Sequence, residues 1–480
     1  MTADADGPSK DALAGSSRPT SGRGAHGPST VALELAATRR GHEANLLAWA
    51  IALTTAAGFL LELATEQPAL WLPLLQATGL SALAAIAHTA TRRLAPLADP
   101  VVLPLVVLLN GIGLVLIRRV DLAEGTRLAG LQMAWSTIAV LGFVIVLAVL
   151  RSPRQIARYH YTLGLLTVLL LLLPMLPGIG REINGARLWI NLGPMSFQPG
   201  ELAKLTMVGF LAGYLEQKRA LLSVATTRIG PLLMPPARHL GPVLAAAGAS
   251  LLVMVVQRDL GTAMLFFGTF IVLLWIATGR VTYPAVGSLA FLAGGAIAWR
   301  MFDHVRLRVS IWLDPWADID GAGYQLAQVA FAMSTGGLTG TGLGLGRPND
   351  LPYAATDAIF AVLGEELGLL GAIAVLVAYL LLVTRALHMS LTARDEVGTL
   401  VAAGLAATLG LQVFVVVGGL TRVVPLSGIT LPWVSYGGSS LVANYVLLGV
   451  LLRVGDEARR VELLGPEAAA NPSALTGARP

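Results

Sequence analysis

The stretch YAATDAIFAVLGEELGLLG, residues 353–371, passes from a polar loop into a long apolar segment. Asp357 stands at the junction, so a carboxylate lies at the edge of a hydrophobic helix. Ionisable side chains are costly near hydrocarbon, and those found there are candidates for function. A plain helix N-cap is the competing interpretation of the same aspartate. Asp357 is therefore the first candidate for a reacting group.

The composition is that of a membrane protein. Of the 480 residues, 55% are hydrophobic and 13% are charged, and the mean hydropathy is +0.71. Soluble domains carry about 25% charged residues. The chain has no cysteine, which excludes a disulfide framework and a thiolate metal site. The net charge of +5 indicates basic cytoplasmic loops rather than a nucleic-acid-binding surface, so we expect no nucleic acid among the partners.

Apolar stretches of about 20 residues, enough to cross roughly 30 Å of hydrocarbon, recur along the chain. They predict an all-α, polytopic helical membrane protein with about twelve transmembrane helices. The expected spans lie at 46–64, 69–91, 99–117, 130–150, 160–177, 200–216, 237–256, 260–278, 281–299, 358–384, 397–418 and 430–452.

The two ends of the chain differ from this pattern. The first 40 residues are polar and rich in Gly, Ser, Pro, Ala and Arg, and we expect a disordered cytoplasmic tail at 1–44 rather than a signal peptide. N-terminal transmembrane helices follow at 45–150, and a second block covers 151–455. A cytoplasmic C-terminal tail is expected at 456–480.

The basic residues set the expected orientation. With the N-terminus in the cytoplasm, roughly 21 Lys and Arg residues fall inside and about 11 outside, as membrane proteins favour. Arg118 and Arg119 are the main exception. Both termini are then cytoplasmic, and the loops 178–199 and 300–356 lie outside. Loops of this length usually have a function or are disordered, and we expect the large extracytoplasmic loop 300–356 to be folded and functional.

The first outer loop leads into FQPGELAK, residues 197–204. Glu201 and Lys204 are three residues apart, so they share one face of the helix that follows. They form either a mutually satisfied ion pair with a snorkelling lysine or, with Arg187 from the loop above, a cationic site for phosphate.

Further polar residues occur in QRDLGTA, residues 257–263, and in the long outer loop. Asp259 is expected to cap the helix that starts there, or else to hold a cation of the same cavity. The long loop supplies Arg306 and Arg308. It also carries an acidic cluster without the regular ligand order of a calcium loop, so a divalent site there is only weakly indicated.

The run GTGLGLG, residues 340–346, has alternating glycines but no preceding strand, so we reject a dinucleotide-binding motif. A flexible turn or hinge is the plain alternative. If a helix begins at Asp357, Glu365 lies roughly 12 Å deeper and about 80° around from it, while Glu366 points about 180° away. Asp357 and Glu365 are therefore expected to line one cavity, and Glu366 to contact another helix.

Together, several motifs resemble the SEDS family of bacterial cell-wall polymerases (RodA, FtsW and SpoVE), and most of all an actinobacterial RodA-type protein. The resemblance covers roughly residues 160–455. The chain departs from the family pattern at Gly200, Arg258, the lead-in at 353–356, and Ala358. The motifs, in order, are GARLWINLG, FQPGELAK, QRDLGTA, WLDP followed by GAGYQ and GGLTGTGLG, TDAIFAVLGEELG and LPWVSYGGSS.

The resemblance implies a core of ten spans with two more before it, in the cytoplasmic membrane. It also implies an inverting peptidoglycan glycosyltransferase that joins lipid II units at the outer membrane face and releases undecaprenyl pyrophosphate. Asp357 would take the proton from the attacking hydroxyl. The implied partners are lipid II, the growing glycan strand, membrane lipid and a class B penicillin-binding protein, which supplies the transpeptidase.

The resemblance also assigns roles to the other polar residues. The candidates to hold pyrophosphate, with Mg²⁺ or Mn²⁺ and no organic cofactor, are Arg187, Lys204, Arg306 and Arg308. The residues that would orient or balance these cations are Glu201, Asp259 and Glu365. A flippase for lipid-linked precursors and a non-enzymatic scaffold for a penicillin-binding protein remain the alternatives. Roles in elongation, division and sporulation stay open, and the short cytoplasmic tail and the extra spans favour a RodA-like role.

Overall fold

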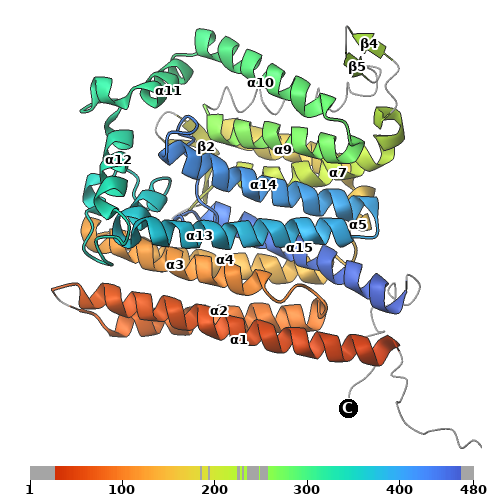
Figure 1. Ribbon diagram of the computed structural model, residues 1–480, viewed down its shortest axis with the longest axis horizontal. Coiled ribbons are helices and arrows are strands. Elements are labelled where there is room, and N and C mark those ends of the chain that lie inside the picture. Colours follow the sequence, from red (N-terminus) through yellow and green to blue (C-terminus); the bar gives the residue numbers. More distant parts are fainter. Residues whose placement is uncertain are drawn as a thin grey trace, which may run out of the picture.

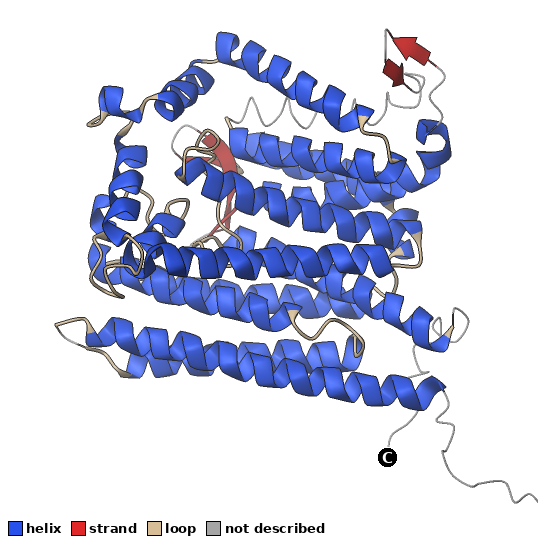
Figure 2. Ribbon diagram, viewed as in Figure 1, coloured by secondary structure: helices blue, strands red, loops and turns tan. Residues whose placement is uncertain are grey.

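The protein is a bundle of long helices that run back and forth along one common direction (Figures 1 and 2). A computed structural model describes residues 28–66, 68–183, 186–192, 195–223, 227–229, 232–234, 248 and 258–465. The helices are α1 (Pro28–Leu63), α2 (Trp71–Leu94), α3 (Val102–Glu124), α4 (Leu128–Val149), α5 (Arg154–Arg158), α6 (His160–Leu172), α7 (Gly200–Ser223), α9 (Leu260–Thr278), α10 (Thr282–Met301), α11 (Asp303–Leu313), α12 (Tyr324–Gly336), α13 (Ile359–Thr392), α14 (Glu396–Leu420) and α15 (Gly438–Leu464).

The expected polytopic membrane fold is confirmed. Within the described residues, nine helices are long and apolar enough to cross a membrane. The other expected spans that can be assessed are the shorter α6 with its 3-10 extension η1 (Leu173–Met175), and α7, which has 24 residues but more polar ones. The span expected at 237–256 falls almost entirely outside the described residues.

Three expected boundaries are wrong. α1 begins at Pro28, so residues 28–44 are helical rather than part of a disordered tail. α15 continues to Leu464, which places residues 456–464 in that helix instead of in a C-terminal tail. The same helix starts at Gly438 rather than near 430, because the proline-containing segment before it forms turns.

The segment 178–199, which the sequence analysis expects to be an outer loop, contains β-strands. It forms a three-stranded antiparallel sheet of β1 (Gly180–Ile183), β2 (Ala186–Leu192) and β3 (Met195–Phe197). A second, two-stranded sheet pairs β4 (Thr227–Ile229) with β5 (Leu232–Met234). The long loop 300–356 is folded as expected, into α11, α12 and two 3-10 turns, η2 (Pro315–Asp318) and η3 (Pro348–Asp350).

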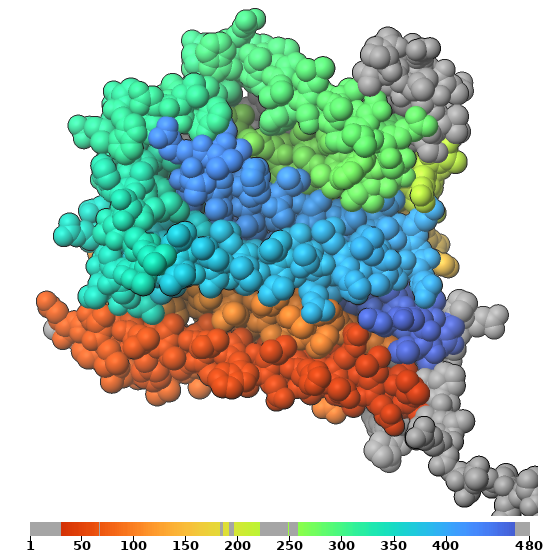
Figure 3. Space-filling view, viewed as in Figure 1, coloured from red at the N-terminus to blue at the C-terminus, as the bar shows by residue number. Residues whose placement is uncertain are grey.

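α1 and α2 lie at one edge of the bundle and α10 at the opposite edge (Figure 1). The space-filling view shows α13 and α14 exposed on the face between them (Figure 3). α3 and α15 supply much of the buried core, and polar side chains join helices there. Asn110 of α3 donates to the Ser136 hydroxyl of α4 at 3.3 Å and to the Tyr445 hydroxyl of α15 at 3.2 Å.

The N-termini of α7, α9, α13 and α15 lie at one end of the bundle together with β1–β3, α11 and α12; we call this the loop end (Figure 1). Contacts between the motif segments define it. The Gln198 backbone N–H, just before α7, donates to the Ser439 hydroxyl of α15 at 2.7 Å. We call the opposite end, with the first turns of α1, the loop 95–101 and the last turns of α13 and α15, the tail end.

The glycine-rich run is docked on a break in α13 and is not the flexible hinge that was expected. Gly368 has φ 67° inside α13, which interrupts the helical hydrogen bonds. The backbone N–H groups of Thr341 and Gly342 donate to the carbonyls of Glu365 and Glu366 at 2.9 and 3.0 Å. Gly340 has φ +84°, and a Cβ there would lie 2.1 Å from the Glu366 carbonyl oxygen. Glycine is required at this position by both backbone conformation and space.

Both glutamates of the GEELG motif hold this docked run with their side chains. Glu365 Oε1 accepts from the Arg347 N–H at 3.0 Å, and Glu366 Oε2 from the Gly344 N–H at 3.1 Å. Arg119 of α3 pairs with Glu366 Oε1 at 2.6 Å and donates to the Gly346 carbonyl at 2.6 Å. Arg119 is an exception to the expected excess of Lys and Arg on the cytoplasmic side. Its ion pair with a buried carboxylate explains why a basic residue occurs at the loop end.

We predict that Arg119→Met destabilises the protein by about 3–5 kcal/mol, because it leaves the fully buried Glu366 carboxylate without its cation. The thermal unfolding midpoint of the purified chain in detergent measures the effect. The matched control is Arg187→Met, which removes an arginine whose pair with Glu182 is exposed, and should change stability by less than about 0.5 kcal/mol. Equal midpoints for the two variants would contradict the prediction.

Candidate active site

Asp357 lies in the turn before α13 and does not cap it. The helix begins at Ile359, and Ala358 occupies the cap position. The Asp357 carboxylate, partly buried, accepts hydrogen bonds from the Thr356 hydroxyl to Oδ1 at 2.8 Å and from the Gln325 amide of α12 to Oδ2 at 3.4 Å. Helix capping is therefore not what places a carboxylate here.

The turn that carries Asp357 is tied to the segment before α15. The Ser435 hydroxyl donates to the Thr356 carbonyl, and the Tyr436 N–H donates to the Ala355 carbonyl at 2.8 Å. Ser435 and Tyr436 belong to the LPWVSYGGSS motif. The motif thus fixes the backbone on which Asp357 stands.

Arg308 of α11 reaches the turn that follows α14. Its guanidinium donates to the carbonyls of Leu426 at 2.7 Å and Ser427 at 3.2 Å. Gly428 has φ +70°, and a Cβ there would lie 3.8 Å from the guanidinium. A glycine at this position allows the left-handed turn that presents two successive carbonyls to one cation.

Asp259 caps α9 as predicted, since its Oδ1 accepts from the Thr262 N–H at 3.0 Å. The cap lies against the turn that receives Arg308. A Cβ on Gly261, two residues after Asp259, would lie 2.6 Å from the Ser427 carbonyl oxygen. Asp259 therefore caps a helix and also stands next to the Arg308 site, so both of its predicted roles are compatible.

Lys204 of α7 forms the predicted ion pair with Glu201, at 2.7 Å from Nζ to Oε2. Its Nζ also donates to Gln412 Oε1 of α14 at 2.8 Å, and the lysine is only 2% exposed. Within the described part of the chain, two of the three ammonium donors thus have acceptors. The side-chain amide of Gln412 in turn donates a hydrogen bond to the Thr430 carbonyl at 2.9 Å, which fixes its position.

Five of the candidate residues form one electrostatic group, the polar cluster of Glu201, Lys204, Asp259, Arg308 and Asp357. Burial raises the pKa of the Asp357 carboxyl, while its hydrogen bonds and the Arg308 charge oppose that rise. Burial also raises the pKa of Asp259; the Glu201 charge adds to the rise and Arg308 again opposes it. Burial lowers the pKa of Arg308, and both aspartates counteract this. Arg308 is the cation common to the two carboxylates.

Three candidates lie apart from the polar cluster. Arg187 is exposed on β2 and pairs with Glu182 at 3.1 Å. Arg306, two residues before Arg308, is exposed and lies 3.4 Å from Asp303. Glu365 contacts the docked glycine-rich run, and no hydrogen bond or ion pair among the described residues joins it to Asp357. The structure therefore does not show the shared Asp357–Glu365 cavity that the helical arithmetic predicted.

The acidic residues of the long loop do not fit a resident metal ion. Asp314 Oδ1 accepts from the Trp316 N–H at 3.1 Å, and Asp318 Oδ2 from the Ala322 N–H at 2.8 Å, so each holds its own turn. Over the described ranges, no group of three or more His, Asp or Glu residues is placed to bind a metal. We assign no step of the reaction to a metal ion. A requirement for Mg²⁺ or Mn²⁺ stays a prediction.

Residues that the sequence reasoning passed over complete the site. Gln325 contacts Asp357, and Gln412 contacts Lys204 from more than 200 residues away along the chain. Gln325 stands in the GAGYQ motif, which could have drawn attention to it. Gln412 is in an otherwise apolar helix, where an isolated polar side chain signals an interhelical contact.

Comparison with known proteins decides the family. Residues 100–460 match the family model of the FtsW, RodA and SpoVE group, described as a cell cycle protein. The chain belongs to this family. It is 44% identical over 430 residues to the peptidoglycan glycosyltransferase RodA of Mycobacterium tuberculosis, covering 88% of this chain and 92% of that protein.

Two further relatives place this FtsW/RodA/SpoVE protein within the group. It is 37% identical over 292 residues to the stage V sporulation protein E of Bacillus subtilis, covering 60% of this chain and 77% of that protein. A solved structure described as coordinating polymerization and crosslinking in a peptidoglycan synthase complex superposes with a TM-score of 0.53 at 29% identity. The match covers 79% of this chain and 96% of that one. The similarity to RodA thus extends beyond the polar cluster to most of the chain.

Proposed function

We propose that this protein is a peptidoglycan glycosyltransferase that polymerises lipid II into glycan strands at the outer face of the cytoplasmic membrane. The observation that carries the proposal is the polar cluster at the loop end. There Asp357 is partly buried, does not cap α13, and lies in the electrostatic field of Arg308. The relatives named peptidoglycan glycosyltransferase RodA support the reaction class.

In the proposed reaction Asp357 is the general base. It accepts the proton of the acceptor GlcNAc 4-hydroxyl while that oxygen bonds to C1 of the donor MurNAc. The C1–O bond to pyrophosphate breaks, and its electron pair leaves with undecaprenyl pyrophosphate. Attack opposite to the leaving group converts an α-linked donor to a β-linked product in one inversion, so no covalent enzyme intermediate is needed.

Arg308 and Lys204 are the cations in the best position to stabilise the developing pyrophosphate charge. Preorganised donors aimed at the developing charge are usually the largest single catalytic contribution. Arg308 is held by two carbonyls and Lys204 by Glu201 and Gln412, so neither must reorganise during the reaction. Burial raises the pKa of Asp357 toward a range in which it is a useful base.

We place the loop end outside and the tail end in the cytoplasm. The excess of Lys and Arg in the loops of the tail end supports this orientation. We also propose a class B penicillin-binding protein as partner, because crosslinking of the strands needs a transpeptidase. The related synthase complex, whose description names both polymerization and crosslinking, supports this pairing.

The test is purified full-length protein incubated with labelled lipid II, alone and with its penicillin-binding partner. Glycan strands should form and undecaprenyl pyrophosphate should be released, one per bond made. A flippase would move lipid II across proteoliposomes without forming polymer. A scaffold would form none, and its Asp357→Asn variant would complement a deletion strain. Failure to polymerise under both conditions would overturn the proposal.

The pH dependence provides a further prediction. Arg308 lowers the pKa of Asp357, so Arg308→Gln removes that influence and raises the pKa. Because the base must be deprotonated, the acidic limb of the rate profile should move to higher pH in the variant. Polymerisation rates at saturating lipid II across the pH range measure it. A limb that stays in place or moves to lower pH would show that Arg308 does not act on the base.

A further inference from the structure

A pocket of about 340 Å³ lies at the tail end, far along the bundle from the polar cluster. Four segments meet there: the early turns of α1, the end of the loop 95–101 with the start of α3, the last turns of α13, and α15. Its charged and histidine lining residues are Arg39, His42, Asp99, Arg385, His388 and Arg459.

The charge of this pocket is unbalanced. Three guanidinium groups and one carboxylate line it, which gives 3 − 1 = +2 with both histidines neutral. Asp99 is shared, since its Oδ1 accepts from the Val101 N–H at 2.9 Å and its Oδ2 lies 3.4 Å from Arg385. Arg459 has one further partner outside the lining, the exposed Glu462 at 2.8 Å.

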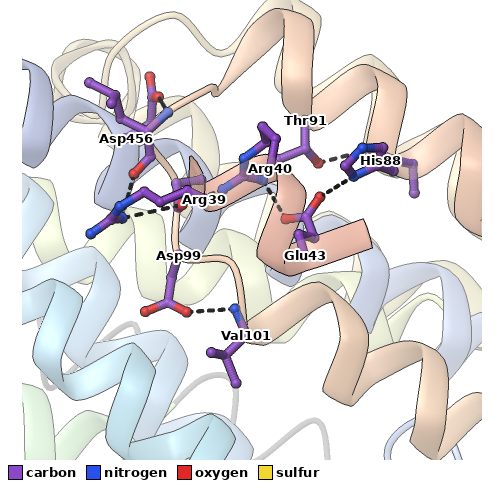
Figure 4. A network of polar contacts seen from close by, with 11 residues as sticks. Arg39, Arg40, Glu43, His88, Thr91, Asp99, Val101 and Asp456 are labelled. Carbon is purple, nitrogen blue, oxygen red and sulfur yellow. Dashed lines mark hydrogen bonds and ion pairs between the residues drawn. The ribbon is translucent and has the colours of Figure 1, made fainter. Parts of the chain in front are cut away.

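Arg39 is held in place by neutral groups rather than by a carboxylate. Its guanidinium donates to the Leu97 carbonyl at 2.9 Å and to the Ala98 carbonyl at 3.4 Å. The loop that offers these carbonyls is anchored in turn, because the Leu97 N–H donates to Asp456 of α15 at 2.8 Å. Figure 4 shows Arg39 above Asp99 with Asp456 nearby. These hydrogen bonds to carbonyl groups position the Arg39 guanidinium without neutralising its charge.

Apart from Glu462, which pairs with Arg459, the neighbouring charged residues are paired with one another and not with the pocket cations. Arg40 forms an ion pair with Glu43, and Glu43 also contacts His88 at 2.7 Å (Figure 4). Asp456 is taken by Arg460 at 2.8 Å and Arg453 at 3.6 Å. The Glu43–His88 contact joins α1 to α2, and the ion pairs of Asp456 lie within α15. The pocket in front of them keeps its excess of cations.

Apart from Thr38 and Thr392, the rest of the lining is apolar, and the pocket borders an apolar surface. Leu35, Val101 and Met389 contribute to it. On α13, the helix that supplies Arg385 and His388, the adjacent Leu391 is 83% exposed. In a membrane protein such an exposed leucine faces lipid. A ligand with a phosphate and an acyl chain therefore fits better than a soluble anion.

We propose that this pocket binds the phosphate group of an anionic membrane phospholipid in the cytoplasmic leaflet. Guanidinium groups match phosphate in geometry as well as in charge, and basic pockets between helices on the cytoplasmic side suit anionic headgroups. The lipid would tie α1 to the ends of α13 and α15. The site thus joins α1, which precedes the region matched to the family model, to α13 and α15 inside that region.

The experiment titrates purified full-length protein with short-chain phosphatidylglycerol, short-chain phosphatidylcholine and inorganic phosphate, with the thermal unfolding midpoint as readout. Phosphatidylglycerol should raise the midpoint saturably, and the other two probes should not. In the double variant Arg385→Gln/Arg459→Gln, the lipid should bind about 25-fold more weakly, roughly fivefold for each cation removed. Arg39 is left intact because it also supports the loop 95–101.

The matched control is Arg394→Gln, which removes an exposed arginine at the same end but outside the pocket, and should leave binding unchanged. If the double variant fails to fold, Arg385→Gln alone should weaken binding about fivefold. Equal effects of phosphate and phosphatidylglycerol would overturn the lipid assignment. Unchanged lipid binding in the pocket variants, or equal loss in Arg394→Gln, would overturn the site itself.

Discussion

Asp357→Asn is expected to reduce the rate of glycan polymerisation by about 10²–10⁴-fold, the usual contribution of a positioned general base. The amide has the size of the carboxylate and can still accept from the Thr356 hydroxyl, so the turn before α13 should keep its shape. Removal of a negative charge beside Arg308 should leave the binding of an anionic substrate equal or tighter. The loss should therefore appear in kcat and not in the affinity for lipid II.

The control for this variant is Asp320→Asn. Asp320 is an exposed carboxylate in the same long loop, so its substitution makes the same charge change without touching the polar cluster. It should polymerise at the wild-type rate. Turnover of labelled lipid II, together with a binding titration on the same samples, gives both quantities. An Asp357→Asn variant within tenfold of wild type, or one that has lost lipid II binding, would contradict the assigned role.

Lys204→Met is expected to cost about 3–5 kcal/mol of stability, the largest structural effect predicted for the site. Lys204 is 2% exposed, and its ammonium is the partner of both Glu201 and Gln412. Methionine fills similar space, so the loss comes from an uncompensated buried carboxylate. The thermal unfolding midpoint in detergent, with and without lipid II, measures it.

A double-mutant cycle separates charge from packing. Glu201→Gln combined with Lys204→Met removes both charges, so most of the lost stability should return while activity stays low. Arg219→Met serves as the control, since the Arg219–Glu396 pair is about half exposed and should contribute little. A double variant as unstable as Lys204→Met would show that the lysine acts through packing and not through its charge.

The membrane-spanning helices could be predicted, because they are long apolar runs. The helix cap at Asp259 could be predicted as well, because this residue directly precedes one of those runs. The relative positions of the loops could not. Arg306 and Arg308 differ by two residues, or about 200° around a helix, so only one of them can face the polar cluster. Which one does so depends on how α11 lies against the turn that follows α14, and no local pattern in the sequence encodes that.

The cavity predicted to be shared by Asp357 and Glu365 stays a prediction. That prediction assumed one regular helix from Asp357 onward, whereas α13 begins at Ile359 and is interrupted at Gly368. Backbone groups at the interruption form hydrogen bonds with the docked glycine-rich run, and Glu365 holds that run. The β1–β2 hairpin was missed although Asn184 and Gly185 form a common hairpin-turn pair in the sequence.

The unusual lead-in to Asp357 has a packing explanation. Ala354 is fully buried and Ala355 is 6% exposed, and both belong to the main hydrophobic core. A larger or charged side chain at either position would have to be accommodated inside that core. Small residues before Asp357 therefore suit this chain even though they depart from the family pattern.

The most direct test of the central claim is the pH dependence of glycan formation by wild type and by Asp357→Asn at saturating, labelled lipid II. The wild-type rate should rise with pH as Asp357 loses its proton, at a pH above the usual range of an aspartate because burial raises its pKa. The residual rate of Asp357→Asn should be flat over the same range. A residual rate with the same acidic limb would show that another group is the base, and would contradict the assignment of Asp357.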